Sequence, residues 1–158
     1  MNSKSSSKRI RRRVGDVAII PLGEGNLIAY AVVLDDASFA IFDARGDLSV
    51  ERALQRTPMF YVAVMDSAIK SGRWPVITVP KDFVPQLSAP ATFMQDPLNP
   101  EKIHIYHLGR MTPATREDIA GLECTAVWSP EHVEDRVRDE YFGRRNKWLE
   151  SLMPQGSR

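Results

Sequence analysis

Cysteine is almost absent from this sequence of 158 residues, which contains a single one, Cys124. One thiol excludes an internal disulfide and any metal site built from several cysteines, as expected in a reducing compartment. Apolar runs near the roughly 18 residues of a membrane-spanning helix are also absent. In RRRVGDVAIIPLGEG, charge, glycine and proline interrupt the apolar stretch too early for a secretory signal. These absences predict a cytoplasmic protein that is not inserted in a membrane.

Acidic residues are missing from the first 13 positions, which contain Lys4, Lys8, Arg9, Arg11, Arg12 and Arg13. The rest of the chain keeps 15 of the 21 basic residues against all 20 acidic ones, a net charge of −5 at pH 7. The opening MNSKSSSK is rich in serine and lysine and cannot offset its ordering entropy by burial. We expect a flexible basic arm over residues 1–13, followed by one globular domain over 14–153.

Stretches rich in β-branched and aromatic residues predict strands in the first half. VAIIPL and LIAYAVVL flank Gly23-Glu24-Gly25-Asn26 as in a hairpin, and SFAIFDA follows a turn at Asp35-Asp36. The segment MFYVAVM is apolar throughout, which indicates a strand covered on both faces. Residues 66–100 contain six prolines, so we expect a wrapping loop with one short strand at WPVITV.

The second half predicts two further strands and then helices. IHIYHL and LECTAVW have strand composition, and Ser129-Pro130 is typical of a helix start. One face of that helix repeats every four residues at Val133, Val137 and Tyr141. Shorter helices are predicted after Ser49 and within RRNKWLESLM. The fold class is therefore α+β, with a curled, mostly antiparallel sheet or small barrel-like β core and one or two C-terminal helices.

Motifs of nucleophilic catalysis are weak in this sequence. Ser67 and Lys70 match S-x-x-K, a spacing that places a hydroxyl beside a lysine in some acyl-transferring enzymes. Gly72 and Pro75 follow too soon for a long helix, and no companion motif is present. A polar turn after a strand is the alternative interpretation, and it predicts no catalytic residue.

Metal and cofactor patterns are equally weak. His104 and His107 point to opposite faces of a strand because they lie three apart, and His132 belongs to another element. The Gly23-x-Gly25 pair lacks the third glycine and the crossover helix of a dinucleotide site. We therefore predict no metal site and no cofactor.

A run of acidic residues extends from Arg116 to Glu140, with eight acids against three arginines and a local net charge of −5. One interpretation is a solvated helix face supported by a Glu134–Arg138 pair one turn apart. The other is a docking surface for a basic protein, since complementary charge accelerates association and suppresses wrong partners.

The basic arm indicates an alternative function, binding of RNA or DNA by a small β-barrel protein. The residues would be Arg9, Arg11, Arg12 and Arg13, because arginine pairs well with phosphate. No helix-turn-helix, zinc motif or RNA-binding aromatic pair accompanies these arginines.

Two stretches resemble the immunity protein twenty-six family of bacterial polymorphic toxin systems: GDVAIIPLGEG with the following IAYAVVL and FAIFD, and then VMDSAIKSGRWPVI. The resemblance covers residues 14–80 and is carried by Gly15, Asp16, Pro21, Leu22, Gly23, Tyr30, Phe42, Asp43, Trp74 and Pro75. It implies an α+β or mostly β domain encoded beside a toxin that is often a nuclease. It implies no catalytic residues.

Together these features predict an immunity protein that is not an enzyme and neutralises a cognate toxin as a monomer or weak dimer. Its predicted acidic contacts are Glu131, Glu134, Asp135, Asp139 and Glu140. Arg73 and Trp74 would form an interface anchor, because arginine and tryptophan are frequent hot spots. The other interpretation of Trp74 is a core residue whose indole N–H is donated inside the fold.

Overall fold

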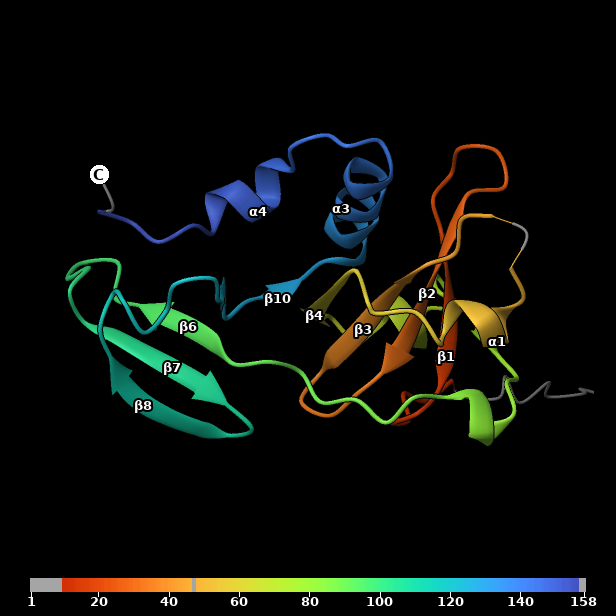
Figure 1. Ribbon diagram of the computed structural model, residues 1–158, viewed down its shortest axis with the longest axis horizontal. Helices are drawn as coiled ribbons and strands as arrows, with labels where there is room; N and C mark the ends of the chain where they lie inside the picture. Colours follow the sequence, from red (N-terminus) through yellow and green to blue (C-terminus); the bar gives the residue numbers. More distant parts are fainter. Residues whose placement is uncertain (1–9, 47, 157–158) are drawn as a thin grey trace, which may run out of the picture.

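The chain folds into two β-sheets and several helices, as the computed structural model of residues 10–46 and 48–156 describes (Figure 1). The larger sheet has the order β10-β4-β3-β2-β1-β5, and the smaller has the order β8-β7-β6-β9. The strands of the larger sheet are β1 (Val17–Pro21), β2 (Ile28–Val33), β3 (Ser38–Asp43), β4 (Phe60–Val64), β5 (Val76–Ile77) and β10 (Val127–Trp128). Those of the smaller are β6 (Thr92–Gln95), β7 (Ile103–His107), β8 (Arg110–Ala114) and β9 (Glu123–Cys124). The helices are α1 (Val50–Ala53), α2 (Ser67–Lys70), η1 (Lys81–Phe83), α3 (Pro130–Tyr141) and α4 (Lys147–Ser151).

A meander of antiparallel strands forms the centre of the larger sheet. Gly23 and Gly25 have positive φ in the β1–β2 connection, which glycine reaches without a side-chain clash. Residues 39–42 of β3 are all buried, so this strand is covered on both faces. In β4 buried and half-buried residues alternate, so the expectation that MFYVAVM is covered on both faces is wrong. The half-buried residues of β4, Tyr61 and Ala63, line a groove between the two sheets.

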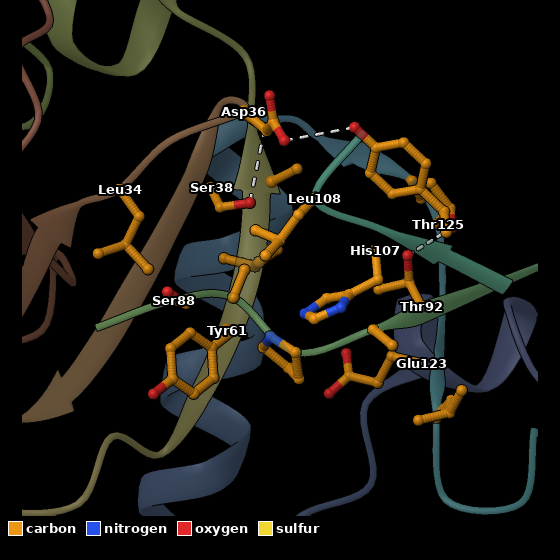
Figure 2. Close-up of a pocket in the computed structure, with 18 of the residues that line it drawn as sticks. Leu34, Asp36, Ser38, Tyr61, Ser88, Thr92, His107, Leu108, Glu123 and Thr125 are labelled. Carbon is orange, nitrogen blue, oxygen red and sulfur yellow. Dashed lines mark hydrogen bonds between the residues drawn. The ribbon is translucent and has the colours of Figure 1, made fainter. Parts of the chain in front are cut away.

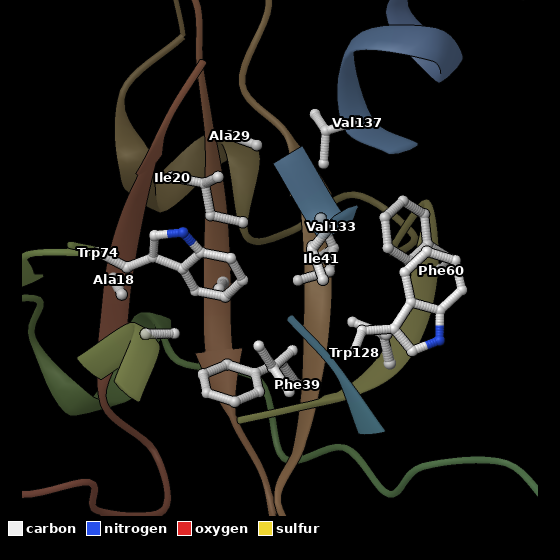
Figure 3. Packing of buried hydrophobic residues seen from close by; sticks show 14 of the residues in the cluster. Ala18, Ile20, Ala29, Phe39, Ile41, Phe60, Trp74, Trp128, Val133 and Val137 are labelled. Atoms are coloured by element: carbon white, nitrogen blue, oxygen red, sulfur yellow. The ribbon is translucent and has the colours of Figure 1, made fainter. Parts of the chain in front are cut away.

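The main hydrophobic core lies between the larger sheet and α3 (Figure 3). Ser129 begins α3 because its Oγ accepts a hydrogen bond from the amide of His132, and Pro130 occupies the first turn. The predicted apolar face of α3 is buried at Val133, Val137 and Tyr141. The opposite face of the sheet is covered by α1 and by the segment after β5, through Leu54, Val79, Val84 and Leu87.

The smaller sheet has its own core of Phe93, Ile103 and Ile119. In the described part of the chain the two sheets remain separate, so the core is not closed into a barrel. The sequence did not predict β6 or β8. β8 contains Pro113 but lies at the edge of its sheet, where a missing amide breaks no ladder on the open side.

The consecutive strands β9 and β10 connect the two sheets. β9 runs parallel to β6 in the smaller sheet, and after two further residues β10 runs parallel to β4 in the larger one. The chain returns to the smaller sheet near its end, where the side-chain amide of Gln95 donates to the carbonyl of Gln155 and accepts from its amide. No helix within residues 10–46 and 48–156 is long and apolar enough to cross a membrane.

Tyr141 predicts a specific loss of stability at high pH. Its hydroxyl donates to the Ile28 carbonyl (2.8 Å) and accepts from the Ala44 amide (3.0 Å). Burial raises the pKa of Tyr141 from 10.0 to about 12, so the protonated form stabilises the fold below pH 10 and this contribution disappears as the pH rises through 12. Between pH 9 and pH 12 the free energy of unfolding should fall by about 2 kcal/mol more than in Tyr141→Phe. Urea denaturation across this range measures both proteins, and parallel curves would contradict the prediction.

Candidate functional site

The acidic residues of α3 are mostly paired inside the molecule. Glu134 is 6% exposed and accepts two hydrogen bonds from the guanidinium of Arg73, at 2.7 and 2.9 Å. The indole N–H of Trp74 donates to the same carboxylate at 3.1 Å. Arg73 also reaches Glu131, with Nη1 3.3 Å from Oε1. Trp74 itself is 0% exposed, which favours the interpretation as a core residue over that as an interface anchor.

Asp135 and Asp139 are also engaged. Asp135 accepts hydrogen bonds from Arg138 (2.7 Å) and from the indole of Trp148 (2.9 Å). Burial raises the pKa of Asp135, but these two hydrogen bonds outweigh it and leave the pKa below its usual value. The Asn146 amide donates to Asp139 at 2.9 Å. The expected Glu134–Arg138 pair is therefore wrong, because each residue has a different partner.

Four of the five predicted acidic contacts thus have a cationic partner within the chain, since Arg144 lies 3.4 Å from Asp139. Of these five residues, Glu140 alone has no ion pair within the described residues, and it is exposed. A carboxylate already paired with a guanidinium contributes little field at the surface. The outer face of α3 is therefore a poor candidate for attracting a cationic partner.

A groove of about 490 Å³ lies between the two sheets (Figure 2). Its lining residues belong to segments 34–38, 61–63, 87–92, 106–108 and 121–128. Figure 2 shows Leu34 and Tyr61 on one side and His107 and Glu123 on the other. The hydroxyl of Tyr106 donates to Asp36 at 3.4 Å, which links a strand of the smaller sheet to a turn of the larger one.

The groove holds three carboxylates, of which Asp36 alone has no cationic partner among the described residues. Its lining includes the carboxylates of Asp35, Asp36 and Glu123, and within the described residues it includes no lysine or arginine. Glu123 is held by Arg136, with two bonds of 2.8 and 2.9 Å. The groove therefore suits a cationic group better than an anionic one.

Backbone strain concentrates at this groove. Three residues other than glycine have positive φ in the described chain, namely Asp36 (53°), Ala37 (59°) and Leu108 (49°). Asp36 and Leu108 line the groove, and Ala37 follows Asp36 in the turn between β2 and β3. Side chains are disfavoured in this conformation, and residues held in it cluster at functional sites. This strain marks the two turns at the groove as the best candidate functional surface.

The chemistry available in the groove favours binding over nucleophilic attack. Burial raises the pKa of Cys124, which keeps its thiol protonated, and the Sγ donates to the Thr125 carbonyl at 3.7 Å. The hydroxyls of Thr92 and Thr125 lie 2.6 Å apart and satisfy each other. In residues 10–46 and 48–156 no group of three His, Cys, Asp or Glu side chains is placed to hold a metal ion. The threonine hydroxyls of the groove can donate hydrogen bonds to a bound segment or accept hydrogen bonds from it.

The S-x-x-K match lies in α2, where the partner of Lys70 is an aspartate. Lys70 is exposed and its Nζ lies 3.1 Å from Asp66, so the ammonium group is engaged in an ion pair. Ser67 begins α2, a helix of four residues at the surface.

The basic arm is described only from residue 10 onward, and Arg9 lies outside the described residues. Arg12 folds back, and its Nη2 donates to the carbonyls of Leu34 and Ser38. Burial lowers the pKa of Arg12, although Asp66 and Asp35 raise it. Arg11 and Arg13 are exposed. One of the four arginines expected to bind nucleic acid is therefore engaged by the fold.

The residues that carry the family resemblance have structural roles. Gly15 has a φ of 89° and donates its amide to Val33, and the carbonyl of Asp16 accepts from the Val33 amide. Pro21 ends β1, and the Pro75 carbonyl accepts from Ile19. These contacts shape the β1–β2 pair and the edge at β5, at the opposite end of the strand order from β4, and those to Val33 lie directly before the groove-lining Leu34.

The chain was compared with models of known protein families, with curated proteins and with solved structures, and none of the three comparisons found a match.

Proposed function

We propose that this protein acts by binding another protein in the groove between its two sheets, as an immunity protein that neutralises a cognate bacterial toxin. The observation that carries this proposal is the groove itself, which has the carboxylate of Asp36 and, among the described residues, no lysine or arginine in its lining. Two of the three non-glycine residues with positive φ in the described chain line it. The resemblance of residues 14–80 to an immunity protein family is the reason for proposing a toxin as the partner.

Two features support binding of a protein segment. The groove offers apolar and main-chain surface beside carboxylates, the mixture that anchors a side chain and fixes its orientation. Val127 lines it and is 58% exposed, so apolar surface is available to a partner. The carboxylate of Asp36 in the groove also favours capture of a cationic toxin, which an inhibitor needs.

Placing a positive charge in the groove should weaken the complex. Val127→Arg alters an exposed side chain of the short edge strand β10, so the fold should be retained. We expect the dissociation constant of the complex with the product of the adjacent gene to rise about 30-fold or more, the effect of removing an interface hot spot. Biolayer interferometry measures it, and a toxin activity assay should show a parallel loss of neutralisation.

Leu98→Arg is the matched control, because Leu98 is 95% exposed and does not line the groove. The control should bind like the unchanged protein. The absence of a stoichiometric complex with the unchanged protein at micromolar concentration would contradict the proposed function, and equal binding by Val127→Arg would exclude the groove.

A further inference from the structure

We infer that the groove recognises one chemical pattern in its partner, a lysine or arginine beside an apolar residue, with Asp36 receiving the cation and Leu108 the apolar side chain. This inference rests on the proposed function and specifies the ligand of the same groove.

Among the residues that the structure describes, Asp36 is the carboxylate of the groove without a charged partner. Glu123 is neutralised by Arg136, whose two nitrogens lie 2.8 and 2.9 Å from its oxygens. Asp35 has the positive charge of Arg12 nearby. Asp36 is exposed, and within residues 10–46 and 48–156 its carboxylate receives only the neutral hydroxyl of Tyr106, at 3.4 Å. Since a carboxylate can accept about four hydrogen bonds, Asp36 retains the capacity to bind a guanidinium or ammonium group.

Leu108 is an unusual residue for its position. It forms the two-residue turn between β7 and β8 with Gly109, and both have positive φ, at 49° and 80°. Such turns strongly favour asparagine followed by glycine, because asparagine tolerates this conformation better than leucine. Leu108 is 59% exposed, so it does not recover this cost by packing in the core. A side chain that strains its own turn and stays in solvent is well suited to contact a partner.

The two turns are close enough for one short segment to contact both. Tyr106 comes two residues before Leu108, and its hydroxyl reaches Asp36 across the groove at 3.4 Å. Neighbouring side chains of one bound segment can therefore contact Asp36 and Leu108 together. Val127 lines the same groove and extends its apolar surface.

A peptide pair tests the cation directly. The isotope-labelled protein is titrated with acetyl-Ala-Leu-Arg-Leu-Ala-amide and with the same peptide carrying citrulline, the neutral analogue of arginine. We expect amide shifts at residues 35–38 and 106–109, and an affinity three- to fivefold higher for the arginine peptide, about what one exposed ion pair contributes. Shifts elsewhere, or equal affinity for the two peptides, would overturn the inference.

Two variants assign the roles of the turns. In Asp36→Asn the preference for arginine over citrulline should disappear, whereas the exposed Asp82→Asn, outside the groove, should keep it. In Leu108→Asn the affinity for both peptides should fall about tenfold through lost apolar contact, while the melting temperature rises by about 2–4 °C because the turn is relieved. A Leu108→Asn protein that binds as well as the parent, or that loses stability, would contradict the role of Leu108.

The peptide experiment and the partner experiment fail independently. If the peptides bind with the expected selectivity but the adjacent gene's product forms no complex, the proposed recognition of a cation beside an apolar residue is supported and the proposed toxin partner is contradicted. If a tight complex forms and neither Asp36→Asn nor Leu108→Asn weakens it, the proposed function is supported and the proposed roles of Asp36 and Leu108 are contradicted.

Discussion

Glu123→Ala should lower the free energy of unfolding by about 3–5 kcal/mol, the usual cost of leaving a buried charge without its partner. The side chain of Glu123 is 40% exposed, but that of its partner Arg136 is only 8% exposed. Arg136 lies between two aromatic rings, with its guanidinium carbon 3.8 Å from the centre of Phe60 and 5.2 Å from that of Trp128. Removing the carboxylate therefore leaves a desolvated cation in an aromatic pocket.

A variant of Arg136, the residue that pairs with Glu123, separates the effect of charge from that of packing. Arg136→Met keeps an apolar stem between the rings and removes the charge, so Glu123→Ala in that background should cost less than about 1 kcal/mol. Glu101→Ala is the surface control, because Glu101 pairs with Arg116 while 77% exposed and should contribute at most about 1 kcal/mol. Urea denaturation measures all four proteins. A double variant as unstable as Glu123→Ala would show that the unpaired cation is not the cause.

This ion pair also joins the two sheets. Glu123 belongs to β9 at the edge of the smaller sheet, and Arg136 belongs to α3, which covers the larger one. Because Glu123 lines the groove, the pair fixes one wall of the candidate site. Stability and site geometry are therefore linked at this position, and the binding of Glu123→Ala has to be measured on its folded fraction.

The strands β1 to β3 were predictable because their signals are local, whereas LECTAVW, predicted as one strand, is divided into β9 and β10 of different sheets. Residues 17–22, 27–34 and 38–44 combine β-branched and aromatic residues with turn residues between them, and these signals survive in any context. The start of α3 was equally clear from Ser129-Pro130. By contrast, Thr92–Gln95 is a four-residue strand between prolines, and Pro113 lies inside an edge strand. Proline excludes central strands, and the sequence does not reveal which strand will be at an edge.

The candidate site was not predictable because its residues meet only in the folded chain. The acidic residues of α3 are visible in the sequence, but their partners are not. Arg73 lies 61 positions before Glu134 and neutralises its carboxylate. No local rule relates them. The groove similarly draws on five separate segments. Leu108 before Gly109 would be a signal, because a hairpin turn favours asparagine there, but the sequence did not predict β8 and therefore did not show that these two residues form a turn.

Trp74→Ala should be as destabilising as Glu123→Ala, by about 3–5 kcal/mol, because a large ring leaves a cavity in a close-packed core. Trp74 is fully buried and contacts Phe39 edge to face, with centroids 5.7 Å apart at 85°. Trp74→Phe keeps part of the ring but removes the donor to Glu134. Since Arg73 still supplies two hydrogen bonds to that carboxylate, the phenylalanine variant should lose only about 1–2 kcal/mol.

The same pair of variants distinguishes a core tryptophan from an interface anchor. If Trp74 were a hot spot, Trp74→Phe would keep its stability and lose affinity for the partner. Because the ring is enclosed between the larger sheet and α3, we expect the reverse, a folded fraction that binds with unchanged affinity and unfolds at lower urea concentration. Binding measured on the folded protein, beside its urea midpoint, decides between them. A tenfold loss of affinity at unchanged midpoint would mean that the Arg73–Trp74–Glu134 cluster opens toward the partner on binding.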